Sequence, residues 1–219
     1  MEGLSLAQQI AIWTLPVLFA ITVHEVAHGW MAGKLGDPTA KMLGRLTLNP
    51  IKHIDPIGTV AVPLALLLMT GGSMVFGWAR PVPVTYENLK HPRRDMALVA
   101  AAGPIANLIM AVLWGIVAKV GIMLAGAEPL IGLPLLYMGA AGILFNLLLM
   151  LFNFLPIPPL DGGRVLVGIL PPKLGWQLNQ IEPYGLIILV GLLATGLLGQ
   201  MLGPVLQSMN QGLFRLLGL

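Results

Sequence analysis

Long stretches without charge constrain this chain more than any other feature of its sequence. Residues 8–23, 95–125, 129–160 and 184–214 are each nearly free of charged side chains. A helix needs about 20 apolar residues to cross the hydrocarbon core of a bilayer. Of all residues in the chain, 57% are hydrophobic and 10% are charged, whereas a soluble domain carries about 25% charged residues. The sequence therefore predicts an all-α, multi-pass protein of the cell membrane.

Composition also predicts a single domain and excludes several kinds of site. The sequence shows no charge run, linker or low-complexity tract, so we expect one domain over residues 1–219. It has no cysteines, which excludes disulfides and thiolate metal ligands. The formal net charge is +3, and the positive residues cluster in short loops. Such clusters are typical of membrane topology signals and argue against a nucleic-acid partner.

Gly and Pro residues mark the ends of the predicted helices. We expect a core of three transmembrane helices with further helices around it. The first helix should stop where Gly36-Asp37-Pro38 interrupts the apolar run. The predicted ranges are 6–34, 95–124 and 133–154 for the core helices and about 184–218 for one or two C-terminal helices, with Gly203-Pro204 as a candidate interruption.

The region between the first two core helices, about 37–90, is predicted to be re-entrant or membrane-associated. Alternating side chains at Arg45-Leu46-Thr47-Leu48 favour a short strand. Pro81 and Pro83, two positions apart, favour an edge strand or an extended segment. We therefore expect short β or re-entrant segments beside an otherwise helical core.

His24, Glu25 and His28 form an H-E-x-x-H sequence inside the first predicted helix. Residues four apart lie on one face of a helix, so His24 and His28 can bind one metal ion. Glu25 is next to the first of them and is predicted to take a proton from water. A catalytic zinc lowers the pKa of water to about 7, which makes hydroxide available at neutral pH. The pattern therefore predicts zinc-assisted hydrolysis of a peptide bond.

The same pattern can arise by chance on a solvated helix face. Here, however, the two histidines and the glutamate lie in an apolar helix. Ionisable groups without partners are costly inside a membrane, and function is the default expectation for them. A metal site is therefore the favoured interpretation.

Asp161 is the favoured third ligand, because a catalytic zinc usually has three protein ligands. His53 and His91 lie in basic loops instead. Asp161 stands between Pro158-Pro159 and Gly162-Gly163, so irregular backbone is placed at membrane depth. Such backbone is tolerated only where protein buries it or where it lines a water-filled cavity. Asp161 could also cap the helix that begins at about Gly162.

Positive charges and the predicted metal site give the same topology. One basic group follows the first helix, and a second precedes the helix at 95–124. Positive loops favour the cytoplasm, so residues 57–77 are predicted not to cross the bilayer, and Pro63 and Gly71-Gly72 would permit them to turn back. Asp161 can reach the two histidines only if the chain between them crosses the bilayer an even number of times. The helices at 95–124 and 133–154 provide two crossings. Both arguments place the active site nearer the cytoplasmic face.

Three motifs follow one another along the chain and are highly specific together. They are His24-Glu25-x-x-His28, Gly103-Pro104-x-x-Asn107, and Asn153-x-x-Pro156 leading to Leu160-Asp161-Gly162; the stretches from His53 to Thr59 and from Phe76 to Val84 accompany them. With these residues, the chain resembles the site-2 protease family of intramembrane zinc metalloproteases, in the compact form without a PDZ domain. The resemblance covers about residues 15–170.

This resemblance implies regulated intramembrane proteolysis of transmembrane protein substrates in the lipid bilayer. Zn²⁺ would be bound by His24, His28 and Asp161, and Glu25 would be the catalytic acid/base. Asn153 would help hold the substrate backbone near the metal, and Asn107 is a second candidate for positioning substrate. Asn153 could equally hydrogen-bond backbone carbonyls of its own helix.

Two other functions could use the same residues. A membrane metal transporter would bind a passing ion, but it would need further ligands along a path and would not need Glu25. A catalytically idle scaffold would bind membrane helices, but it predicts a lost ligand or a lost glutamate, and all four residues are present. The sequence gives no sign of the oligomeric state.

Overall fold

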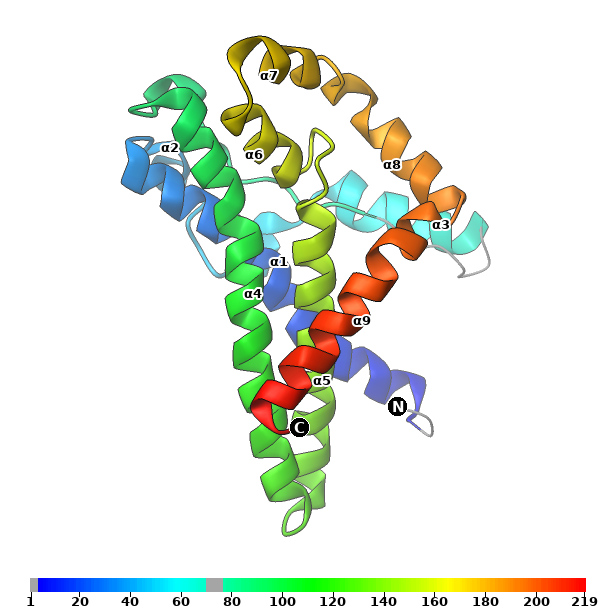
Figure 1. The fold of residues 1–219 in the computed structure, drawn as a ribbon. Helices are drawn as coiled ribbons and strands as arrows, with labels where there is room; N and C mark the ends of the chain where they lie inside the picture. The colour runs from blue at the N-terminus through cyan, green and yellow to red at the C-terminus, as the bar shows by residue number, and fades with distance from the viewer. Residues whose placement is uncertain (1–3, 70–76) are drawn as a thin grey trace.

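Three long helices form the body of the molecule. The structure is a computed structural model that describes residues 4–69 and 77–219. Within these residues, α1 (Leu6–Leu35), α4 (Pro92–Ala125) and α5 (Pro129–Asn153) are long and apolar enough to cross a membrane. The other helices lie around them, mostly towards one end (Figure 1). The predicted all-α, multi-pass membrane class is confirmed.

Local sequence explains where α1 begins and ends. The Ser5 hydroxyl accepts a hydrogen bond from the Gln8 amide, and the Gln8 side chain accepts one from the Ser5 amide, which makes a capping box. At the other end, Gly36 adopts a φ of 115° and donates its N–H to Ala32 O. Glycine adopts this left-handed conformation without steric cost. The helix therefore stops about two to three turns beyond the H-E-x-x-H residues.

Small residues let α4 and α5 pack closely as an antiparallel hairpin. A Cβ atom on Gly121, Gly132 or Gly139 would collide with the backbone of the opposite helix. Such close approach is typical of packed membrane helices. Helix α1 packs against both α4 and α5. The buried side chains between α4 and α5 are Ala111, Trp114, Ile143, Leu147 and Met150.

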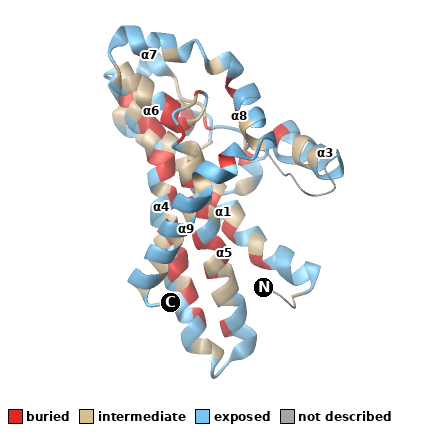
Figure 2. Cartoon of the chain, turned by 45° about the vertical axis from the view of Figure 1, so that its right-hand side comes forward, coloured by how far each residue is buried: buried red, intermediate tan, exposed pale blue. Residues whose placement is uncertain are grey.

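The outer faces of the three long helices are apolar and exposed. Figure 2 shows buried residues where α1, α4 and α5 meet and exposed residues on the faces turned outward. On α4, for example, Ile105, Ile109 and Ile116 are about half exposed, at 50%, 56% and 49%. In water such a surface would be costly, but lipid is as apolar as these side chains. The exposed faces therefore fit a bilayer environment.

The connection between α1 and α4 contains short helices and extended chain. Its helical parts are α2 (Thr39–Met42), η1 (Pro50–His53), η2 (Pro56–Ala61), α3 (Val62–Met69) and η3 (Tyr86–Asn88). No strand forms in the described part of this connection, so the predicted strand at 45–48 is wrong, and of the two alternatives for 77–85 the extended segment is the one observed. Residues 77–85, which we call the extended segment, are extended but unpaired.

Proline and long-range hydrogen bonds explain why the extended segment has no partner strand. Pro81 and Pro83 have no N–H to donate to a ladder. The N–H groups of Trp78 and Arg80 donate to Gly58 O at 3.0 Å and to His53 O at 2.9 Å. Each backbone donor therefore binds a different part of the connection.

The connection returns to the end of the bundle from which it starts. The Lys90 N–H donates to Leu35 O at 3.1 Å, so the end of α1 adjoins the start of α4. Helices η2 and α3 have six and eight residues, which span about 21 Å together, less than the roughly 30 Å of a bilayer core. Both observations agree with the predicted turning back of residues 57–77. The predicted bend at Gly71-Gly72 and the motif residue Phe76 lie outside the described residues.

The C-terminal part of the chain runs back along the bundle. It comprises α6 (Asp161–Ile169), α7 (Pro172–Asn179), η4 (Glu182–Tyr184), α8 (Gly185–Ala194) and α9 (Leu197–Leu217). The bend before α9 is 78° and falls at Gly196, whose φ is 73°. The predicted interruption at Gly203-Pro204 is not seen, because α9 is continuous through both residues. Helix α9 packs on α4 and α5, and Lys119 Nζ donates to Leu217 O at 2.6 Å.

Candidate metal centre and active site

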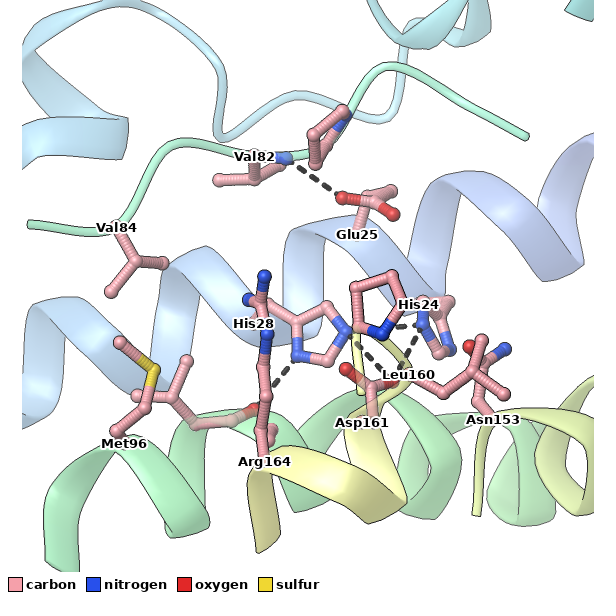
Figure 3. A pocket seen from close by; sticks show the side chains of 14 residues that line it. His24, Glu25, His28, Val82, Val84, Met96, Asn153, Leu160, Asp161 and Arg164 are labelled. Atoms are coloured by element: carbon pink, nitrogen blue, oxygen red, sulfur yellow. Dashed lines mark hydrogen bonds and ion pairs between the residues drawn. The ribbon is translucent and has the colours of Figure 1, made fainter. Parts of the chain in front are cut away.

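Three side chains that are distant in the sequence meet beside the end of α5. Asp161 Oδ2 lies 3.2 Å from His24 Nε2 and 3.3 Å from His28 Nε2, and the two nitrogens are 3.0 Å apart (Figure 3). Their side chains are only 7–12% exposed. In a tetrahedral zinc site with bonds of about 2.0–2.1 Å, ligand atoms lie about 3.3 Å apart. The three atoms therefore have the spacing of zinc ligands.

Hydrogen bonds on the far side of each imidazole direct its other nitrogen to the centre. His24 Nδ1 is 2.6 Å from Asn107 Oδ1, and His28 Nδ1 is 2.7 Å from Val99 O. Because carbonyl oxygens only accept, both Nδ1 atoms carry the proton and both Nε2 atoms present lone pairs. Asp161 Oδ2 is buried and has no hydrogen-bond donor among the described residues. Three acceptors thus converge on one point, which fits a divalent cation.

Asp161 is the first residue of α6 and lies outside the three spanning helices. The N-cap of this helix is Leu160 and not Asp161, and the Asp161 carboxylate lies against the histidine pair. A carboxylate binds a metal in its ionised form, and the oxygen that faces the two imidazoles completes the donor set.

Two glycines after Asp161 permit the close fit of α6 to the rest of the site. A Cβ atom on Gly162 or Gly163 would collide with the backbone of residues 154–158, just after α5. Seven residues beyond Asp161, a Cβ atom on Gly168 would collide with α4. The glycines therefore let α6 approach both helices and deliver Asp161 to the histidines.

Gly103 is the contribution of α4 to the metal centre. A Cβ atom at this position would overlap the rings of both His24 and His28. Helix α4 can therefore lie against the imidazoles only with glycine at position 103. The Gly103-Pro104 motif thus makes room for the ligands as well as for helix packing.

A chain of buried amides holds His24 in place. Asn107 Nδ2 donates to Asn146 Oδ1 at 2.9 Å and to Ala20 O at 3.1 Å, so its Oδ1 faces the imidazole. Asn146 Nδ2 donates in turn to Gly142 O at 2.8 Å. Both asparagines are fully buried. The orientation of this metal ligand therefore depends on hydrogen bonds that reach from α1 through α4 to α5.

The two asparagines differ from the sequence prediction in different ways. Asn107 is predicted to position substrate, but it does not line the pocket and its amide is engaged with His24. Asn146 is not predicted at all. A lone amide within an apolar helix is the signal that could have found it, since polar groups inside a membrane need partners.

Glu25 points towards the extended segment. Its Oε2 accepts a hydrogen bond of 2.8 Å from the Val82 N–H (Figure 3). Val82 is thus the third residue of the extended segment, after Trp78 and Arg80, whose N–H forms a hydrogen bond. The bond fixes the segment over the carboxylate. Glu25 therefore lies between the metal ligands on α1 and a wall built from the loop.

A cavity of about 160 Å³ opens beside the metal ligands. Asn153 lines this cavity, and its Nδ2 donates to Leu149 O at 3.0 Å, within its own helix. The cavity therefore brings the predicted base, the ligands and Asn153 together. Its full lining is His24, Glu25, His28, Pro81, Val82, Val84, Met96, Val99, Ala100, Asn153, Pro159, Leu160, Asp161 and Arg164.

Comparisons with known proteins identify relatives that are named as zinc metalloproteases. The chain is 41% identical over 210 residues to YwhC of Bacillus subtilis (strain 168), named as a candidate zinc metalloprotease; the match covers 92% of this chain and 89% of YwhC. It is 32% identical over 179 residues to Rip2 of Mycolicibacterium smegmatis, named in the same way, covering 81% of this chain and 64% of Rip2. The zinc metalloprotease MJ0392 of Methanocaldococcus jannaschii is 27% identical over 177 residues, covering 80% of this chain and 40% of that protein. No protein-family model and no solved structure matches the chain.

Proposed function

The chain belongs to the site-2 protease family of zinc metalloproteases, and from this premise we propose that it cleaves transmembrane proteins within or close to the bilayer. The position of the metal donors supports this proposal. Two come from α1, which is long and apolar enough to cross a membrane, and one comes from α6, just beyond the end of α5. A peptide bond that reaches these donors lies in or beside the bilayer. Such cleavage would be an act of regulated intramembrane proteolysis.

His24, His28 and Asp161 would hold Zn²⁺, the metal in the names of the relatives. Zinc bound there supplies a Lewis acid that polarises a carbonyl and lowers the pKa of water. Asn107 and Val99 keep both imidazoles in the tautomer that can bind it. The metal donors are therefore oriented by hydrogen bonds that do not depend on substrate.

Glu25 is the group that would move the proton. Its carboxylate lines the same cavity as the ligands, where it would take a proton from the attacking water and deliver it to the leaving amine. The Val82 N–H donates to Oε2 and so fixes the position of the carboxylate. Asn153, on the wall of the cavity, would hold the substrate backbone by hydrogen bonds.

The size of the cavity bears on the form in which substrate enters. A helix with its side chains is about 10–12 Å across, and a cavity of about 160 Å³ does not admit one. Peptide bonds inside a helix are also shielded by the helix itself. A transmembrane substrate would therefore unwind locally before cleavage.

The decisive test is the Glu25→Gln variant, purified with zinc and reconstituted into liposomes with a single-span reporter protein. Glutamine keeps the size of the side chain but cannot take a proton, so we expect full zinc content and at least a hundredfold slower cleavage, on the order of the general-base contribution. Glu87→Gln, which removes an exposed acid from η3, is the control and should cleave normally. Cleavage by Glu25→Gln at the wild-type rate would disprove the mechanism.

The structure weighs against a metal transporter. Within residues 4–69 and 77–219, His24, His28 and Asp161 are the only group of three His or acidic residues that could hold a metal ion. A transport path would need successive sites. Uptake of zinc into liposomes by this protein would revive that alternative.

A further inference from the structure

Arg164 lines the active-site cavity but has no part in the chemistry described above. It lies three residues after Asp161 in α6, so both side chains stand on one face of the helix. Figure 3 shows its side chain extending from α6 past His28 towards Val82 and Val84. The side chain is 49% exposed, whereas that of Asp161 is 12% exposed. The guanidinium therefore lies at the mouth of the cavity, with the metal donors deeper.

Among residues 4–69 and 77–219, Arg164 forms one ion pair, which is weak and easily replaced. Its Nη2 is 3.9 Å from Glu182 Oε1 in η4, and the Glu182 side chain is 41% exposed. An exposed pair at this distance contributes little to stability. A second carboxylate that approached the cavity could therefore take the place of Glu182.

The charges that line the cavity favour an acidic group at this position. Glu25 and Asp161 are the acidic residues of the lining, and Arg164 is its one Lys or Arg residue. When Zn²⁺ is held by the donor set, its two positive charges offset the two carboxylates of the lining and leave the guanidinium with only its weak pair to Glu182. An acidic side chain at the mouth would be attracted, and a basic one would be repelled.

We propose that Arg164 is a specificity-determining residue that binds an acidic side chain of the substrate close to the scissile bond. A guanidinium can donate two parallel hydrogen bonds to one carboxylate, which suits it to this task. The inference rests on the proposed function, because it requires a peptide in the cavity. It adds a substrate class: membrane proteins with Asp or Glu beside the site of cleavage.

The test measures which amino acids flank the cleaved peptide bond in a library of substrate proteins. The full-length zinc protein is placed in liposomes with single-span proteins that are randomised at the end of their transmembrane segment, and cleavage sites are mapped by mass spectrometry. For the wild type, we expect Asp and Glu near the cut to be enriched about fivefold over Asn and Gln, the effect of an interaction of about 1 kcal/mol. Arg164→Gln should cleave neutral sequences but lose this enrichment. Arg164→Glu should favour Lys and Arg instead.

Two further variants make the test specific. Arg94→Gln removes an exposed arginine near the start of α4 and should keep the wild-type preference. Glu182→Gln removes the competing carboxylate and should raise the preference for acidic residues.

Each result separates this inference from the proposed function. Equal enrichment in wild type and Arg164→Gln would overturn the role of Arg164, and so would loss of all cleavage by Arg164→Gln with zinc retained. If Arg164→Gln does not fold, an unchanged preference in Glu182→Gln overturns the inference and a raised one supports it. A wild-type protein that cleaves no member of the library would instead count against the proposed function.

Discussion

Gly103 illustrates how a metal site can depend on a residue without a side chain. The position is in α4, far along the chain from the ligands, yet a Cβ atom there would overlap both imidazoles. By contrast, Gly33 in α1 is unconstrained, because a Cβ atom there would meet nothing within 4 Å. The two positions therefore form a matched pair for mutation.

We predict that Gly103→Ala lowers zinc affinity about tenfold or more, because overpacking by one methyl group costs about 1–3 kcal/mol where neighbours cannot yield. Titration with a zinc chelator measures the effect directly. Gly33→Ala should leave the affinity unchanged. Equal affinities for the two variants would mean that α4 moves away from the histidines at little cost.

Asn146 shows what residue-by-residue reasoning from sequence overlooks. The ligands and Glu25 are recognisable because a metal demands particular residue types at a particular spacing. Asn146 contacts no ligand and acts only through Asn107. Its role depends on the way α5 faces α4, which no local pattern specifies.

At the scale of elements, the extended segment is held by contacts to several different parts of the chain. Gly58, His53 and Glu25 accept from its first three bonded N–H groups. The N–H of Thr85, at the end of the segment, donates to Asp37 Oδ2 at 2.7 Å. Asp37 is the residue after the C-cap of α1. One wall of the active site is thus fixed to both α1 and the loop that follows it.

Asp37 is fully buried and accepts several hydrogen bonds. The donors are the Thr39 N–H and hydroxyl, the Thr85 N–H and Asn88 Nδ2. Burial raises the pKa of this carboxyl, but these hydrogen bonds outweigh burial and lower the pKa from its ordinary value of 3.8. The ionised carboxylate therefore stabilises the folded state.

We predict that Asp37→Asn lowers the free energy of unfolding by about 2 kcal/mol at pH 7, the size of hydrogen bonds to a charged group. Because the native pKa is lowered, this contribution is fully present above the ordinary pKa of 3.8 and is lost as pH falls through the native pKa. Thermal unfolding in detergent should show a difference between wild type and Asp37→Asn that is constant near neutrality and shrinks in strong acid. A difference that grows in acid would contradict the assignment.

At the scale of the whole molecule, the structure supports a specific topology. The end of α1 adjoins the start of α4, and the turn between α4 and α5 lies at the far end of the hairpin (Figure 1). We propose that the first of these ends, which carries the active site, faces the cytoplasm, as the positive loops predict.

Variants with one introduced cysteine test this topology. The chain has no cysteine of its own, so a thiol reagent labels only the introduced position. We predict that Lys52→Cys and Lys90→Cys react with a membrane-impermeant maleimide only when the cytoplasmic face is accessible. Ala127→Cys, in the turn between α4 and α5, should react only from the opposite face. Labelling of positions 52 and 90 from opposite faces would mean that the chain between them crosses the bilayer.

Much of the architecture was predictable because membranes impose simple rules. Runs of apolar residues predict α1, α4 and α5 to within about four residues at each end. The strand at 45–48 was wrongly predicted, because alternating side chains favour an extended conformation but do not identify a partner strand; the segment at 77–85 is extended, one of the two alternatives predicted for it. Instead of pairing with the extended segment, the 45–48 stretch contacts it through the Arg45 side chain, whose Nη2 donates to Arg80 O at 2.9 Å. Tertiary contacts, and not local sequence patterns, determine the conformation of such segments.

The attachment of the extended segment to Glu25 has a consequence for genetics. A selection for inactive mutants should recover loop substitutions at positions that never approach the metal, together with changes at the ligands. The two classes should be separable by one assay of bound zinc: ligand mutants would lose the ion, and loop mutants would retain it while their base is misplaced.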